Sequence, residues 1–390
     1  MRITFLVRNI WGIGGTIKTT INTAESLVER GHDVTLVSCV RNREKADFRI
    51  DPRIRIKSLW DVRPPAEGGE GLSWTERLLS RWPSELDKEG ARVNNMEQSS
   101  RLFDRRVKRF LAEVDTDILV TTQVTLNLYA AKHARPDLTV VGQEHLFLDK
   151  YSAPLRRQVL SAFGRLDAIV TTTEADAAAY RKELGPEARI IEAIPNSVPA
   201  NTADPSTPRE PVIMAAGRFS RAKGFSTLIE GFGEIAHRYP EWNMRIYGRG
   251  AERKNLQRLI GEYGLRGRVK LPGALTPLDE AWRSASIAAV TSHFEAFGLV
   301  IVEAMSAGTP VVSAAVEHGP KELIDHGRNG LLVEPKQPER LSEALERLMR
   351  DERLRRSLAE RGRETARAYE PSQVVGLHEQ LFERLLKERA

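Results

Sequence analysis

Two positively charged side chains, Arg218 and Lys223, lie five residues apart in a glycine-flanked stretch, residues 216–224. A β-rich run precedes this stretch and an amphipathic segment follows it, so we expect both cations in a loop that opens a helix. The planar fork of arginine, the compact charge of lysine and the N–H groups of a helix N-terminus all favour anionic oxygens. The pattern therefore predicts a diphosphate clamp, although a basic loop taken by itself is more often simply solvated.

Two glutamates, Glu295 and Glu303, accompany a second strand-to-helix turn. A buried strand is expected over residues 287–290, and a helix is expected to begin near Phe297 or Gly298. Glu303 lies among apolar residues in the middle of that helix, where a surface ion pair would be unusual. No cluster of metal-ligating residue types accompanies the two carboxylates, which suit hydrogen bonds to sugar hydroxyls.

Polar and glycine residues also follow two strands of the N-terminal half. A Gly-x-Gly-Gly arrangement ends at Gly14 and Gly15, comes after an apolar run at residues 3–7 and opens an amphipathic helix, which is the setting of a phosphate-binding loop. The third glycine of the dinucleotide fingerprint is missing, so an NAD-dependent dehydrogenase is a weak alternative, and a plain tight turn explains the glycines equally well. His145 follows the strand expected over 139–142, at the edge where ligands of α/β proteins gather.

The elements that must position these residues repeat one order of strands and helices through the chain. Short apolar runs alternate with amphipathic segments, as in parallel sheets with helices on both faces. The fold class is therefore α/β, with two doubly wound Rossmann-like domains. The expected strands are residues 3–7, 34–37, 117–121, 139–142, 168–172, 212–216, 244–247, 269–271, 287–290, 310–313 and 330–333.

Domain boundaries follow from composition. Residues 199–211 contain four prolines and little that can be buried, so they are interpreted as a linker. This divides the chain into an N-terminal domain over 1–198, the linker 199–211, a C-terminal domain over 212–370 and a last helix within 371–390. The last helix is expected to pack back toward the N-terminal domain through one buried face, formed by Val375, Leu377, Leu381 and Leu385.

Composition excludes several classes of protein. The chain has 390 residues, 41% hydrophobic and 29% charged, which suits two globular domains and rules out a disordered or fibrous protein. Its single cysteine, Cys39, rules out an internal disulfide or a thiolate metal cluster and is expected to be buried. The net charge of +6 is spread over both halves, which argues against a nucleic-acid-binding surface. Because no apolar run is long enough for a bilayer span or a signal peptide, we expect a cytoplasmic protein.

Between residues 53 and 110 the first domain departs from the repeated order. Prolines, glycines and polar runs predict long connections and inserted helices, which either contact substrate or decorate the surface. A basic helical cluster closes this segment, with Asp104 as its single opposing charge, and consists of Arg101, Arg105, Arg106, Lys108 and Arg109. A solvated face is the expected interpretation, and weak association with the inner face of a membrane is the alternative.

The two glutamates fall in the pattern Glu-x-Phe-Gly-x-x-x-x-Glu-Ala-x-x-x-Gly-x-Pro-Val-Val, which resembles the signature of retaining glycosyltransferases of family 4. The Gly-Arg-Phe…Lys-Gly loop around Arg218 resembles the diphosphate clamp of that family. Residues 194–198 resemble its interdomain Ile-Pro-Asn-Gly-Val segment, with Ser197 in place of the glycine. The resemblance covers nearly all of the C-terminal half and, less strongly, the first forty residues. Residues 53–110 resemble nothing in the family that can be carried over.

The resemblance implies a GT-B architecture, in which two Rossmann-like domains face each other across a cleft and the C-terminal domain binds a nucleotide-sugar. It implies that Arg218 and Lys223 hold the diphosphate and stabilise it as a leaving group, that Glu303 binds the ribose, and that Glu295 contacts the donor sugar. His145 joins Arg218, Lys223 and Glu295 as a catalytic position. The remaining donor-binding positions that it implies are Gly14, Gly15, Asn196, Gly248, Pro272, Phe297, Gly298 and Leu299.

The implied activity is that of a retaining hexosyltransferase that needs no metal or other cofactor. Its donor is a nucleoside-diphosphate sugar, with UDP as the commonest nucleotide in the family, and its acceptor is a hydroxyl group of a glycan, a cell-wall polymer or a small metabolite. Retention is expected through same-face substitution, in which the departing phosphate accepts the proton of the acceptor. Two alternatives stay open: a non-hydrolysing sugar-nucleotide epimerase on the same fold, and an inactive nucleotide-sugar-binding module.

Overall fold

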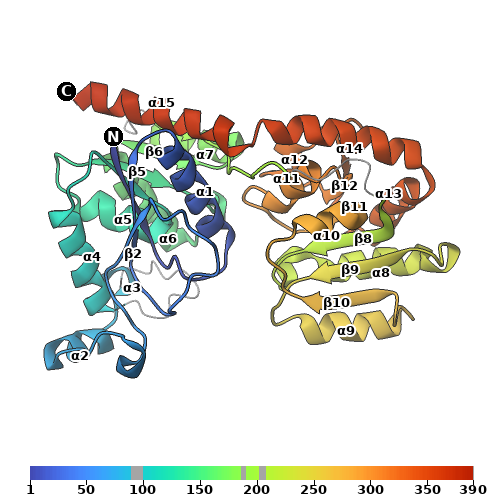
Figure 1. The fold of residues 1–390 in the computed structure, drawn as a ribbon, viewed down its shortest axis with the longest axis horizontal. Coiled ribbons are helices and arrows are strands. Elements are labelled where there is room, and N and C mark those ends of the chain that lie inside the picture. Colours follow the sequence, from blue (N-terminus) through green and yellow to red (C-terminus); the bar gives the residue numbers. More distant parts are fainter. Residues whose placement is uncertain (89–99, 186–189, 202–207, 390) are drawn as a thin grey trace. The chain divides into compact units, whose positions relative to one another are not determined.

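The computed structural model describes residues 1–88, 100–185, 190–201 and 208–389. The chain divides into two compact units, one formed by Met1–Ser197 with Val374–Ala390 and the other by Val198–Gln373. In each unit a parallel sheet has helices on both faces (Figure 1). Residues 202–207 of the expected linker lie outside the described residues, as do residues 89–99 of the divergent segment.

The first unit is built on a seven-stranded parallel sheet in the order β3-β2-β1-β4-β5-β6-β7. Its central strands are buried on both faces, which is why their sequences are continuous apolar runs without alternation. Phe5 of β1, for example, pairs in register with Leu36 of β2 and Val120 of β4. The strands are β1 (Arg2–Val7), β2 (Asp33–Ser38), β3 (Arg55–Ser58), β4 (Ile118–Thr121), β5 (Thr139–Gln143), β6 (Ala168–Thr171) and β7 (Ile191–Ala193).

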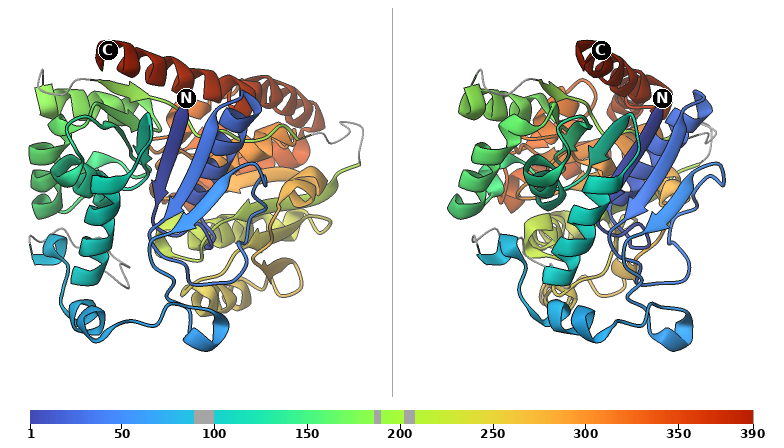
Figure 2. Two further views of the ribbon diagram at one scale, coloured as in Figure 1. Left: turned by 60° about the vertical axis from the view of Figure 1, so that its left-hand side comes forward. Right: turned by 90° about the vertical axis from the view of Figure 1, so that its left-hand side faces the viewer.

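Helices cover both faces of this sheet (Figures 1 and 2). One face packs against α1 (Gly15–Glu29) and α15 (Pro371–Arg389). The other face packs against α4 (Arg101–Glu113), α5 (Val124–His133), α6 (Ala153–Ala162) and α7 (Glu174–Leu184). Cys39 lies in this second core, where burial raises the pKa of its thiol to about 12, so the prediction of a buried thiol is confirmed.

The C-terminal helix α15 corrects one expectation. Its side chains at Val375, Leu381 and Leu385 are buried in the core beside α1, but Leu377 is 42% exposed. The helical period explains the difference, because the buried positions 374, 375, 378, 381, 382 and 385 centre on a face from which position 377 lies about 100° away, beyond the edge of the buried face. Val374, His378 and Phe382 complete the buried face instead.

The second unit is built on a six-stranded parallel sheet in the order β10-β9-β8-β11-β12-β13. Both sheets follow the doubly wound order, so the predicted fold class is confirmed. The strands are β8 (Glu210–Ala216), β9 (Asn243–Tyr247), β10 (Val269–Gly273), β11 (Ala285–Val290), β12 (Val311–Ala314) and β13 (Leu331–Val333). The helices are α8 (Phe225–Ile235), α9 (Arg253–Glu262), α10 (Asp279–Ser284), α11 (Leu299–Ser306), α12 (Pro320–Leu323), α13 (Pro338–Arg350) and α14 (Glu352–Arg367).

The divergent segment contains two further helices, α2 (Trp74–Arg81) and α3 (Glu85–Lys88), before α4. The basic cluster on α4 is less solvated than expected, because Arg106 pairs with Glu70 and Glu76, and Lys108 pairs with Glu85. Three other members of the cluster, Arg101, Arg105 and Arg109, are exposed. Asp104 does not oppose the cluster from the surface, since it is buried and accepts hydrogen bonds from Ser84 and Tyr129. Among the described residues, no helix is long and apolar enough to cross a membrane.

Candidate active site

The order of strands in the second unit brings two loops together. Successive strands are added toward one edge of the sheet from β8 to β10 and toward the other edge from β11 to β13, so the switch point lies between β8 and β11. α/β proteins bind ligands at such a switch point, beyond the carboxyl ends of the strands. The loop after β8 carries Arg218 and Lys223, and the loop after β11 carries Glu295. Two hydrogen bonds join them: His293 N donates to Ala222 O at 2.8 Å, and Thr291 Oγ1 donates to Lys223 O at 3.1 Å.

Lys223 and Glu295 form an ion pair in this structure. Lys223 Nζ lies 2.5 Å from Glu295 Oε1, and the same oxygen accepts a hydrogen bond of 2.6 Å from Ser292 Oγ. The two side chains are only 26% and 10% exposed, so water weakens the pair less than it weakens a surface ion pair. Arg218 differs from Lys223, because its side chain is exposed and forms no ion pair with any described residue. The loop therefore presents one anchored cation and one open cation at the start of α8.

Close packing leaves no room for a side chain at the start of α8. The N-cap residue Gly224 has φ +62°, and a Cβ atom there would lie 2.0 Å from the carbonyl oxygen of Thr291. No described side chain caps this helix, so its first N–H groups are open to an anion. The same holds for α11, whose N-cap Gly298 has φ +94° and which also lacks a side-chain cap among the described residues.

Residues around α11 supply one carboxylate and backbone donors. Glu303 lies in the second turn of the helix, and its Oε2 accepts a hydrogen bond of 3.4 Å from Trp282 Nε1. The Phe297 side chain is buried and its ring packs edge-on against Tyr369 at 5.7 Å between centroids, so only its backbone is available to a ligand. Leu299 is the first residue of the helix, where backbone N–H groups lack intrahelical acceptors.

Gly248 directly follows β9, and Pro272 lies in the neighbouring strand β10, near the same ends of the two strands. A Cβ atom at Gly248 would lie 1.9 Å from the carbonyl oxygen of Gly217, so the packing of two loops by itself requires glycine there. Pro272 was expected in a turn after a strand ending at Leu271, but it is an exposed residue within β10, which extends to Gly273. The strand can continue through Pro272 because β10 is at the edge of the sheet. On an edge strand, the missing N–H group of proline does not interrupt the hydrogen bonds between strands.

The first unit brings its own group of predicted residues together. Gly14 is the N-cap of α1 and Gly15 is its first residue, and no described side chain caps this helix. Gly14 has an extended backbone with φ 171°, and a Cβ atom there would meet nothing within 4 Å. Farther along α1, Thr19 and Thr23 line a small cavity together with His145 and Asn196.

That cavity has a volume of about 10 Å³, which is about the space of one water molecule. His378 of α15 also lines it, and neither His145 Nε2 nor His378 Nδ1 has a hydrogen-bond partner among the described residues. Burial of both rings lowers the pKa of each histidine to about 4, so both are neutral near pH 7. His145 is thus placed as an uncharged donor or acceptor with one open nitrogen.

Sequence reasoning overlooked two polar residues next to the predicted ones. Glu144 is buried and accepts hydrogen bonds from Asn127 Nδ2 at 2.5 Å and from Tyr151, and burial raises its pKa to about 8. It stands next to His145 in the sequence, but nothing in the sequence shows that its carboxyl group turns into the core. Ser292 was also overlooked, although a hydroxyl three residues before Glu295 is a recognisable local partner for that carboxylate.

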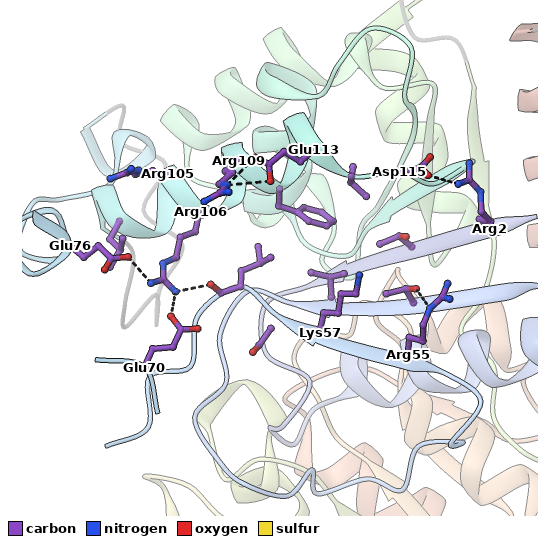
Figure 3. A pocket seen from close by; sticks show the side chains of 18 of the residues that line it. Arg2, Arg55, Lys57, Glu70, Glu76, Arg105, Arg106, Arg109, Glu113 and Asp115 are labelled. Carbon is purple, nitrogen blue, oxygen red and sulfur yellow. Dashed lines mark hydrogen bonds and ion pairs between the residues drawn. The ribbon is translucent and has the colours of Figure 1, made fainter. Parts of the chain in front are cut away.

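A large groove of the first unit lies elsewhere, between the sheet and α4 (Figure 3). It has a volume of about 1000 Å³ and is lined by side chains from β1, β2, β3, α2 and α4, many of which are paired charges such as Arg106 with Glu70 and Glu76. None of the predicted site residues lines it. Among the described residues, no group of three or more His, Cys, Asp or Glu side chains is arranged to hold a metal ion.

Comparison with known proteins identifies the family. The family model "Glycosyltransferase Family 4" matches residues 13–202, and the model "Glycosyl transferases group 1" matches residues 201–365. An exopolysaccharide phosphotransferase of Streptomyces coelicolor is 32% identical over 396 residues, which cover 100% of this chain but only 41% of that protein. An uncharacterized glycosyltransferase of Haemophilus influenzae is 25% identical, over 96% of this chain and 98% of that protein.

A solved structure agrees in fold. The crystal structure of HepE from Anabaena in complex with UDP superposes on this chain with a TM-score of 0.75, at 19% sequence identity, over 98% of this chain and 100% of that one. The two family models together extend from residue 13 to residue 365, through both Rossmann-like units. The chain belongs to the family 4 glycosyltransferases of the GT-B fold.

Proposed function

We propose that this chain is a retaining glycosyltransferase that moves a hexose from UDP-sugar to a hydroxyl group of an acceptor. The observation that carries the proposal is the arrangement of the two loops after β8 and β11. Glu295 holds Lys223 by an ion pair beside the uncapped start of α8, and Arg218 is exposed on the same loop as Lys223. Two cations and open N–H groups at one helix N-terminus are suited to a diphosphate. Support for UDP comes from HepE, which was crystallised with that nucleotide.

In the proposed reaction, Arg218 and Lys223 neutralise the charge that the diphosphate gains as its bond to the sugar breaks. The bond between the anomeric carbon and the phosphate oxygen breaks, a bond to the acceptor oxygen forms on the same face, and the acceptor proton passes to the departing phosphate. Glu303 accepts hydrogen bonds from the ribose hydroxyls and Glu295 from a hydroxyl of the donor sugar. No metal enters the scheme, because the two cations and the helix N-termini supply the positive charge.

The remaining donor contacts are proposed on backbone and neutral groups. In the second unit they are Phe297, Gly298 and Leu299 at the start of α11, with Gly248 and Pro272 toward the nucleotide base. In the first unit they are Gly14, Gly15 and Asn196, together with the neutral ring of His145 toward the sugar. The acceptor, a glycan, a cell-wall polymer or a small metabolite, is proposed to contact the divergent segment over residues 53–110, where the chain leaves the pattern of the family.

The test begins with a thermal-shift panel of UDP, GDP and ADP, followed by UDP-sugars with and without candidate acceptors in the presence of EDTA. We expect UDP to stabilise the protein and transfer to survive chelation. Conversion of the donor sugar into its epimer in the absence of an acceptor would instead identify an epimerase, and loss of activity with EDTA that manganese restores would refute the metal-free scheme.

A matched pair of variants tests the clamp itself. Arg218→Ala should reduce turnover at saturating donor by about 100–1,000-fold, the usual effect of removing one contact that strengthens in the transition state. Arg221→Ala is the control, because Arg221 lies in the same loop but is directed at Glu252 and is 92% exposed. Equal turnover in the two variants would contradict the role of Arg218.

A further inference from the structure

Helix α2 presents an apolar face to solvent. Trp74, Leu78 and Trp82 recur every four residues, on one side of the helix and its C-cap, and are 77%, 50% and 54% exposed. Single exposed apolar residues are ordinary on a protein surface, but a row of two tryptophans and a leucine on one helix is not. Ser73 and Glu76 form a capping box that fixes the start of the helix, so the row is part of a defined element.

The apolar row is not the side of α2 that packs against the core of the first unit. The opposite side of the helix already faces the first unit, since Leu72 and Leu79 pack against its core. Glu76 turns the same way and pairs with Arg106 at 2.8 Å, and this guanidinium lowers the pKa of Glu76 to about 2 (Figure 3). The helix therefore has a buried attachment and, on its other side, a separate apolar face.

Positive charge surrounds the apolar row. Arg77 and Arg81 are exposed on α2, and the start of α4 adjoins the end of the row because Arg101 N donates a hydrogen bond of 3.0 Å to Trp82 O. Arg105 follows one turn along the exposed side of α4 (Figure 3). None of these four arginines forms an ion pair with a residue that the structure describes, and the one carboxylate of α2 is directed inward at Arg106.

We propose that the α2 surface, formed by Trp74, Leu78 and Trp82 with Arg77, Arg81, Arg101 and Arg105, docks on an anionic lipid bilayer. Tryptophan rings favour the boundary between headgroups and acyl chains, and arginines beside them reach phosphate groups while their stems cover apolar surface. Figures 1 and 2 show α2 at the end of the first unit that is opposite the N-terminus, and the side chains of the row are exposed there.

A second copy of the chain fits the surface less well than a bilayer. In a twofold dimer the same patch meets itself, so the four arginines of one copy would face the four of the other with no carboxylate of the patch to offset them. An anionic bilayer supplies both an apolar layer and a dense array of phosphates. The proposal does not rest on the glycosyltransferase activity, because binding to vesicles is measured without donor or acceptor.

The test uses the full chain and two sets of vesicles, phosphatidylcholine alone and an equal mixture of phosphatidylcholine and phosphatidylglycerol. We expect binding to the mixed vesicles only, weakened by salt, with tryptophan fluorescence quenched by brominated acyl chains. The double variant with Trp74→Ala and Trp82→Ala should bind the mixed vesicles at least tenfold more weakly than the wild type. The expected loss is that of burying about one apolar side chain in the bilayer. Arg77→Gln with Arg81→Gln should weaken it about 25-fold, at about fivefold per arginine near the surface.

Control variants change exposed residues of the same kinds elsewhere: Tyr263→Ala with Leu275→Ala for apolar area, and Arg157→Gln with Lys254→Gln for charge. Both controls should bind mixed vesicles as the wild type does, and thermal unfolding of every variant should match the wild type since all these side chains are exposed. Equal binding to both kinds of vesicle, or unchanged binding by the double tryptophan variant, would overturn the proposal. So would sedimentation that shows a dimer which the double tryptophan variant dissociates, with no vesicle binding.

Discussion

The ion pair between Lys223 and Glu295 leads to a prediction about how charge is divided within the donor site. If Lys223 holds the diphosphate, the anion must approach a cation that already has a carboxylate on its other side. Lys223→Ala then has two effects on nucleotide affinity: it removes an attractive cation, and it exposes the diphosphate to the negative charge of Glu295. Replacing Glu295 by glutamine in the Lys223→Ala protein should relieve the second effect and restore part of the affinity for UDP.

The geometry sets the size of this recovery. Lys223 Nζ lies 2.5 Å from Glu295 Oε1. A lysine nitrogen reaches a phosphate oxygen at about 2.8 Å, so a phosphate oxygen held by Lys223 lies at most ~5 Å from that carboxylate oxygen. Two unit charges ~5 Å apart repel by ~0.8 kcal/mol in bulk water and by ~3 kcal/mol at an effective dielectric constant of about 20. These energies correspond to a recovery of about 4-fold to about 200-fold in affinity.

The assay is calorimetric titration of UDP into the wild type, Lys223→Ala, and Lys223→Ala combined with either Glu295→Gln or Glu280→Gln. Glu280 is an exposed carboxylate on α10 and controls for a general change of net charge. Recovery is expected only with Glu295→Gln, and turnover should stay low in every variant because the cation that stabilises the leaving group is still missing. If both double variants bind UDP as weakly as Lys223→Ala, the diphosphate does not share a site with Glu295 and the clamp is refuted.

Three further predictions concern nucleotide binding and stability. Glu303→Ala should weaken UDP by about 1.5–3 kcal/mol, the worth of hydrogen bonds to a charged group, and leave 2′,3′-dideoxy-UDP unaffected in the same titration; equal losses would contradict a ribose contact. Between pH about 4.5 and about 8 the folded protein holds a proton on Glu144 that the unfolded chain has released, so stability should fall as pH rises through this window. His145 and His378 act with the opposite sign between about 4 and about 6.5, so the melting temperature should be highest near about pH 6.5, and Glu144→Gln should remove the alkaline fall. Gly14→Ala should leave thermal unfolding unchanged but reduce donor turnover, whereas a loss of stability would show that the glycine is structural.

The parallel strands could be predicted from the sequence because each is buried on both faces. A run such as β11 (Ala285–Val290) has every residue buried, so local composition alone marks it. The divergent segment could not be predicted in this way, because its organisation depends on partners far away in the chain. Arg106 is one of five basic residues on α4 in the sequence, and only the fold shows that it is enclosed by Glu70 and Glu76 while Arg105 points outward.

In the second unit, the sequence predicted which charged residues belong to the candidate site, but it did not predict how they pair with one another. The sequence predicted Arg218 and Lys223 after one strand and Glu295 after another, and only the resemblance assigned all three to one donor. The fold adds that β8 and β11 are adjacent, so that the two loops lie at one end of the sheet. The direct pairing of Lys223 with Glu295 was not predicted, because both had been assigned to the ligand and neither to the other. A sequence places two charges in neighbouring loops, but it does not show which of them already neutralise each other.

For two glycines that were predicted to bind the donor, the structure shows whether packing within the protein already requires a glycine. Gly14 and Gly248 both follow strands and both were assigned to donor binding on the strength of the resemblance. At Gly248 a Cβ atom would lie 1.9 Å from the carbonyl oxygen of Gly217, so the contact of two loops accounts for the glycine without any ligand. At Gly14 the backbone is extended and a Cβ atom would meet no described atom within 4 Å, so neither conformation nor packing accounts for it. We therefore propose for Gly14 that a ligand approaches the backbone at the uncapped start of α1, because the open N–H groups of a helix N-terminus favour an anion.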